Sequence, residues 1–103
     1  MLDKEAAREI ADRYAHEVRK TLNPKTIILF GSYVNGVPDE NSDIDIAVVF
    51  DGFNGNWLKT ASYLCSLKRR VSIDIEPHMM DATSDRSGFL EHIRKTGEII
   101  YSA

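Results

Sequence analysis

The sequence predicts an α/β protein in which a small mixed β-sheet is flanked by helices. Segments with apolar residues at three- and four-residue spacing alternate with short segments rich in β-branched residues, a pattern typical of helices packed against a sheet. With 103 residues, 43% of them hydrophobic, the chain is long enough for one modest core. No internal repeat or linker interrupts it, so we expect a single domain over residues 1–103.

The first segment predicts an amphipathic helix over residues 3–22. Asp3 is a candidate N-cap because its short side chain can accept a backbone N–H. Pro24 favours an end to the helix, since proline disfavours the helical conformation in the residue before it. The expected apolar stripe comprises Leu2, Ala6, Ile10, Ala11, Tyr14, Val18 and Leu22.

Two strands are predicted next, over residues 26–30 and 43–50. The first, TIILF, consists mainly of β-branched and aromatic residues and is expected to be buried. Between them, GSYVNG predicts a turn with one helical turn, and VPDENS predicts a loop.

A second long helix is expected from Trp57 to about Arg70, with Asn56 as its N-cap. Its predicted buried face comprises Trp57, Leu58, Ala61, Leu64, Cys65 and Leu67.

The remaining elements are short. VSIDIE alternates strictly and predicts a strand over residues 71–76 that Pro77 ends. A helix over residues 89–96 is closed by Gly97 as a C-cap, and EIIY predicts a terminal strand.

The most informative side chains are those of Asp43 and Asp45. Because strand side chains alternate between faces, both aspartates point the same way, while the opposite face is wholly apolar. The aspartate face itself becomes apolar at Ala47 and Val49. Charge is thus confined to one end of the strand, which favours a placed pair, although solvated acids at a strand end remain the alternative.

A third carboxylate, Asp74, joins this pair if its strand lies beside theirs. Carboxylates packed closely repel one another, so some must bind protons or a cation. All-oxygen ligands suit Mg²⁺ or Mn²⁺, and paired metal ions are the usual device for in-line phosphoryl chemistry.

Gly31 and Ser32 stand where the first predicted strand ends. Glycine lets a phosphate approach the backbone closely, and the following turn offers N–H groups together with the Ser32 hydroxyl. The segment is not a P-loop, because it lacks the Gly-Lys-Ser/Thr of that motif.

Ten residues separate Gly31-Ser32 from Asp43-x-Asp45 in GSYVNGVPDENSDID. This arrangement resembles the signature of the DNA polymerase beta superfamily and is similar to its minimal nucleotidyltransferases. IDI around Asp74 stands where the family's third carboxylate follows the next helix, and the likeness extends to the leading helix and the terminal IRKTGEIIY.

The resemblance implies a nucleotidyltransferase fold and transfer of a nucleotidyl group, AMP from ATP, to a hydroxyl acceptor. Asp43, Asp45 and Asp74 would bind two Mg²⁺ ions, with Asp74 helping to activate the attacking hydroxyl, and Gly31 and Ser32 would hold the β- and γ-phosphates. In this family the partner is often a helical protein of the HEPN type, and some pairs are toxin–antitoxin systems in which the partner's tyrosine is modified.

One difference from the family's sequence pattern leaves a second interpretation of the function open. Many relatives carry a cation where this chain has Tyr33-Val34-Asn35, so the alternative is an antitoxin that has kept the fold and acts by binding alone. His78 could reach a ligand from the end of its predicted strand, but we interpret it as a surface loop residue. Glu76 is either a fourth acid of the site or a solvated carboxylate, and the second interpretation is preferred. Cys65 is interpreted as a small core residue.

Composition restricts the other classes of partner. A net charge of −3 without a basic stripe argues against tight nucleic-acid binding. A single cysteine suits a reducing cytoplasm, and no apolar stretch approaches the length of a membrane span. We therefore expect a cytoplasmic protein, with homodimerisation left open.

Overall fold

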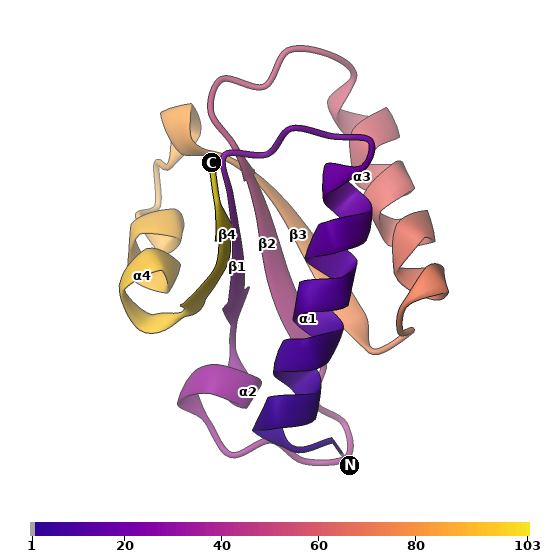
Figure 1. Ribbon diagram of the computed structural model, residues 1–103. Coiled ribbons are helices and arrows are strands. Elements are labelled where there is room, and N and C mark those ends of the chain that lie inside the picture. Colours follow the sequence, from indigo (N-terminus) through magenta and orange to yellow (C-terminus); the bar gives the residue numbers. More distant parts are fainter. Residues whose placement is uncertain (1) are drawn as a thin grey trace.

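A four-stranded sheet in the order β3-β2-β1-β4 forms the centre of the computed structural model (Figure 1). The structure describes residues 2–103; Met1, which the predicted domain includes, lies outside them. The strands are β1 (Thr26–Phe30), β2 (Ile44–Phe50), β3 (Ile75–Asp81) and β4 (Glu98–Ser102). The helices are α1 (Lys4–Arg19), α2 (Ser32–Asn35), α3 (Trp57–Leu67) and α4 (Phe89–Thr96), with 3₁₀ turns at Lys68–Arg70 and Ala82–Ser84.

The sheet is mixed, as the sequence predicts. β1 pairs antiparallel with both β2 and β4, whereas β2 and β3 are parallel and are joined by a crossover through α3. None of the helices formed by residues 2–103 is long and apolar enough to cross a lipid bilayer.

Helix α1 begins as expected. The Asp3 carboxylate accepts the Ala6 N–H at 2.7 Å and so satisfies one of the unpaired donors of the first turn. The helix ends at Arg19, earlier than predicted, and a turn leads into β1.

Successive side chains of β1 and β2 point to opposite faces of the sheet, and because nearly all of them are apolar, both faces are apolar. One face packs against α1 and α3 through a cluster that includes Ile27, Ile46 and Val48. The other packs against α4, where Ala47 and Val49 meet Leu90 and Ile93. Both faces of β2 beyond Asp45 are therefore buried, which confirms the predicted contrast between the charged end of this strand and the rest.

Strand β3 differs from its prediction. It runs from Ile75 to Asp81, so Pro77 lies inside it and does not end it, and Asp74 precedes it. Proline is tolerated because β3 is an edge strand, where an N–H that faces away from the sheet needs no ladder partner. The interpretation of His78 as a loop residue is consequently wrong.

The buried face of α3 is narrower than predicted. Leu64 and Leu67 are buried, but Leu58 is 78% exposed, Cys65 is exposed and Trp57 is partly exposed. The helix packs at the side of the sheet, beside α1, and only one stripe of it meets neighbours. There the Tyr14 hydroxyl donates to the Leu64 carbonyl at 2.7 Å, and burial raises the pKa of Tyr14.

Gly97 follows α4 as predicted, but the reason is packing and not a left-handed cap. Its backbone is extended, with φ −90° and ψ −178°. An added Cβ would stand 2.7 Å from the Ile93 carbonyl oxygen and 2.8 Å from that of Leu29. Glycine therefore lets the chain turn from α4 straight into β4, against β1.

Asp81 ends β3, and its carboxylate links this strand by hydrogen bonds to the turn after β2 and to the 3₁₀ turn after β3. Its carboxylate accepts the N–H groups of Gly52 at 3.0 Å and Phe53 at 2.7 Å, and both the N–H and the hydroxyl of Thr83. The bonds from Thr83, followed by those from Gly52 and Phe53, hold the pKa of Asp81 well below its usual range.

This pKa gives stability a predictable dependence on pH. Because the folded-state pKa lies below the unfolded value of about 3.9, ionised Asp81 stabilises the fold above that pH and loses this contribution as the pH falls through the interval below it. Asp81→Asn is therefore expected to lower the Tm at pH 7, with a difference from wild type that shrinks below about pH 4. Thermal unfolding, followed by circular dichroism at pH 7 and at a pH below about 4, measures the difference in Tm between the variant and wild type. The exposed Asp51→Asn is the control, and a constant Asp81→Asn difference across this range would contradict the account.

Candidate functional site

Gly31, directly after β1, lies against the carboxylate of Asp45 in β2. The pairing of the two strands places Phe30 opposite Asp45, so the next residue reaches the end of the aspartate side chain. Gly31 has φ 85° and ψ −155°, and a Cβ there would collide with the Asp45 Oδ2 and approach its Cγ to 3.2 Å. The structure thus brings the glycine–serine turn and the D-x-D segment together, and only glycine fits between them.

Ser32 starts the single helical turn α2. The Gly31 carbonyl accepts from Val34 and Asn35 at 3.0 and 2.9 Å, which closes the chain tightly around the serine. Ser32 is partly exposed and is one residue from the contact with Asp45. The turn that begins at Ser32 is therefore adjacent to the Asp45 carboxylate.

The two aspartates of the D-x-D segment differ in surroundings. Asp43 precedes β2 and is exposed, whereas Asp45 lies within β2 and its side chain is 26% exposed. Asp45 belongs to the face of the sheet that α4 covers further along, through Ala47 and Val49. It is the acid at the centre of the site.

Asp74 and Glu76 are the acids that β3 brings to this end of the sheet. The Asp74 carbonyl accepts the Ile44 N–H at 2.8 Å, so its backbone lies beside the start of β2. Asp74 lines a shallow cavity of about 290 Å³ together with Leu2, Tyr33, Asp39, Glu40 and Ser42. Glu76 pairs with Asp45 in the parallel register, and laterally paired residues direct their side chains to the same face. The register therefore places Glu76, which the sequence analysis interpreted as a solvated acid, next to Asp45.

His78, interpreted from the sequence as a surface loop residue, lies at this site. Its Nε2 lies 3.1 Å from the Asp45 Oδ1, and its ring meets Phe30 edge-on with centroids 5.0 Å apart. The available signal was the alternation Glu76, His78, Met80, which continues through Pro77 and puts all three on one face.

The donor set suits a hard divalent cation. Asp43, Asp45 and Glu76 supply carboxylate oxygens, the ligands that Mg²⁺ prefers. Within residues 2–103, no group of three or more His, Cys, Asp or Glu side chains lies close enough together to hold a metal ion in the present side-chain positions. The Asp45 carboxylate and Gly31 form the fixed part of the site, while Asp43 and Glu76 are exposed, so rotation of their side chains can bring further oxygens in.

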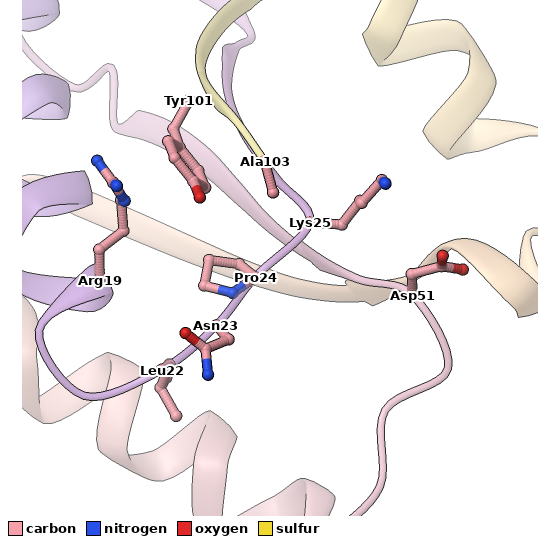
Figure 2. A pocket seen from close by; sticks show the side chains of 8 residues that line it. All are labelled: Arg19, Leu22, Asn23, Pro24, Lys25, Asp51, Tyr101 and Ala103. Carbon is pink, nitrogen blue, oxygen red and sulfur yellow. The ribbon is translucent and has the colours of Figure 1, made fainter.

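A second cavity, of about 310 Å³, lies at the far end of the sheet, where β1 begins (Figure 2). It contains two cationic residues, Arg19 and Lys25, and the Arg19 guanidinium stands 3.8 Å from the centre of the Tyr101 ring. Lys25 directly precedes β1, whereas Ser32 follows its other end. The positive charge of this cavity is thus separated from the acids by the length of the strand.

Comparison with known proteins agrees with this arrangement. A family model described as "Polymerase beta, Nucleotidyltransferase" matches residues 13–103. No curated protein matched the sequence.

Solved structures share the fold at low sequence identity. A protein from Sulfolobus solfataricus assigned as a nucleotidyltransferase has a TM-score of 0.69 and 21% identity, covering 96% of this chain and 83% of its own. A toxin–antitoxin structure with AMP-PNP has a TM-score of 0.66 and 23% identity over 89% of this chain and 73% of its own. The MntA–HepT toxin–antitoxin structure has a TM-score of 0.63 and 18% identity over 93% and 73%.

Proposed function

Because the chain belongs to the polymerase beta nucleotidyltransferase family, we propose that it transfers a nucleotidyl group from a nucleoside triphosphate to a hydroxyl acceptor, with Mg²⁺ as cofactor. The observation that carries the proposal is the contact of Gly31 with the Asp45 carboxylate. It places the glycine–serine turn, which we propose binds phosphate, beside the carboxylate of Asp45, which we propose binds the metal ion.

Asp43 and Asp45 would hold the metal, and a third acid comes from the strand beside them. The resemblance assigns this role to Asp74, whereas the strand register favours Glu76, which shares the face of Asp45. Bound Mg²⁺ would neutralise charge on the phosphates and on the departing pyrophosphate. The exposed position of Glu76 leaves its carboxylate free to turn toward Asp45 or toward the acceptor hydroxyl.

Gly31 and Ser32 would bind the β- and γ-phosphates. Glycine lets the phosphates approach the backbone, and the Ser32 hydroxyl donates a hydrogen bond. His78 would position Asp45 through the hydrogen bond to Oδ1, leaving Oδ2, on the Gly31 side, for the ligand.

ATP is the proposed donor, and a partner protein carries the proposed acceptor. One structural neighbour was solved with AMP-PNP and is, like MntA–HepT, a toxin–antitoxin structure. By the family resemblance, the acceptor is the hydroxyl of a tyrosine on a helical partner of the HEPN type, and this chain is the antitoxin.

Binding without catalysis is the second candidate, and the residues of α2 favour it. Tyr33-Val34-Asn35 offers no cation beside Ser32 to bind the triphosphate. In this case the chain would neutralise its partner by covering it.

Incubation with labelled ATP, Mg²⁺ and the protein encoded next to this chain tests both candidates. Wild type is expected to label that protein, and Asp43→Asn combined with Asp45→Asn is expected to abolish the label because the metal loses its ligands. Omission of Mg²⁺ is the matched control. Labelling that persists in the double variant would refute the proposed site, and a double variant that still neutralises the partner would favour binding alone.

A further inference from the structure

A cavity of about 450 Å³ lies at the edge of the sheet, where β3 ends. It is formed where α3 begins, where β3 ends and where α4 begins, three segments that are far apart in the sequence. Its apolar lining comprises Trp57, Met79, Met80, Phe89 and Leu90, and its polar lining comprises Asp81, Ser84, Asp85 and Ser87. Trp57 and Phe89 remain 38% and 44% exposed, so each offers aromatic surface to a ligand.

Aromatic contacts connect this cavity to the candidate site. Phe89 meets Phe30 with centroids 5.7 Å apart, and Phe30 meets His78 at 5.0 Å. His78 in turn contacts Asp45 at 3.1 Å. Along β3, Met80 follows His78 on the same face at a separation of about 7 Å, since a strand rises about 3.3 Å per residue. Contacts of Phe89, Phe30 and His78 thus connect the cavity with Asp45, and β3 runs from one to the other.

The two carboxylates that line the cavity, Asp81 and Asp85, determine which part of a ligand it can bind. Asp81 is engaged by the protein: its Oδ1 accepts three hydrogen bonds, from Gly52 and Thr83, and its Oδ2 accepts one, from Phe53. Asp85 accepts the Leu90 N–H through Oδ1 and the Glu91 N–H through Oδ2, both at 3.0 Å, and each carboxylate oxygen has room for one further donor. Two carboxylates repel phosphate, whereas Asp85 can accept a hydrogen bond from an amino group.

We propose that this cavity binds the nucleobase of the nucleoside triphosphate, an inference that rests on the proposed function. The base would lie against Phe89 and Trp57, with its exocyclic amino group directed to Asp85. The triphosphate would remain at Gly31 and Ser32, away from the two acids of the cavity. The cavity accordingly favours adenine over bases that lack an exocyclic amino group.

Trp57 provides a direct test because it is the single tryptophan of the chain. Its fluorescence is expected to fall when the full chain is titrated with ATP and Mg²⁺, and also with adenosine alone. Tripolyphosphate with Mg²⁺, which has no base, is expected to leave it unchanged. Quenching by N-acetyltyrosinamide but not by adenosine would overturn the proposal and assign the cavity to the acceptor.

Matched variants separate this inference from the proposed function. Phe89→Ala is expected to weaken ATP binding about tenfold, as measured by calorimetry, and to leave tripolyphosphate binding unchanged. The control is Ile99→Ala, which truncates a similarly exposed apolar side chain on β4 and should not affect either ligand. Asp45→Asn should weaken both.

If Asp45→Asn weakens ATP binding while Phe89→Ala leaves it at the wild-type value, the base cavity is refuted and the proposed function stands. Absence of ATP binding to the wild-type chain would refute both. Since Phe89 packs on Phe30, Asp85→Asn serves as a second variant: it keeps the side-chain size but loses one of two acceptors at the start of α4, so circular dichroism is used to confirm that it is folded. Its expected effect is a reduced preference for ATP over inosine triphosphate, and an unchanged preference would count against the proposal.

Discussion

Glu76→Gln is expected to lower the rate of nucleotidyl transfer by about a thousandfold, because loss of a metal-binding carboxylate removes several kcal/mol of transition-state stabilisation and each 1.4 kcal/mol is about tenfold in rate. Glu76 is the acid that the parallel register places on the face of Asp45. The substitution removes only the charge and keeps the side-chain size, and Glu76 is exposed, so folding should be unaffected. Initial rates at saturating ATP and Mg²⁺ measure the effect.

Asp74→Asn is the comparison variant for this prediction. Asp74 precedes β3 and lines a separate shallow cavity with Ser42 and Tyr33, so its loss is expected to change the rate by no more than about threefold, the scale of a surface charge near the site. The reverse order, with Asp74→Asn inactive and Glu76→Gln active, would restore the assignment that the family resemblance implies.

Gly31→Ala is expected to damage both stability and activity. With φ 85° and ψ −155°, Gly31 occupies a backbone region that is essentially restricted to glycine, and an L-residue there costs about 1–3 kcal/mol. For a chain of this size, such a loss lowers the Tm by about 10 °C. The added methyl group also displaces the Asp45 carboxylate, so transfer activity should fall at temperatures where the variant is still folded.

Gly52→Ala is the matched control for this prediction. Gly52 also has a positive φ, 74°, but an added Cβ meets nothing within 4 Å. This variant should therefore lose some stability while its transfer rate stays at the wild-type value. Equal losses of activity in the two variants would show that backbone strain alone, and not contact with Asp45, makes glycine necessary at position 31.

The parts of the fold that depend on local patterns could be predicted from the sequence. β1 and β2 could be predicted because both are short segments rich in β-branched and other apolar residues. The burial of Ala47 and Val49 beyond Asp45 followed from the alternation of strand side chains between the two faces, and the caps Asp3 and Asn56 followed from their side-chain chemistry.

The errors arose where neighbouring segments decide the outcome. Pro77 ends a central strand but not an edge strand, and the position of β3 in the sheet is a property of the whole fold. The contact between His78 and Asp45 and the pairing of Glu76 with Asp45 depend on that strand and its register. A role at the site was therefore the less favoured interpretation of both residues from the sequence. Likewise Leu58 and Cys65 match a helical stripe, but α3 lies at the side of the sheet and does not bury them.

Pro77 also affects how the molecule behaves among other copies of itself. An open sheet edge exposes a row of backbone donors and acceptors on which a foreign strand can add, and proline removes one donor from the middle of that row. Strand addition along β3 is thereby disfavoured, which protects against aggregation at the edge that borders the acids.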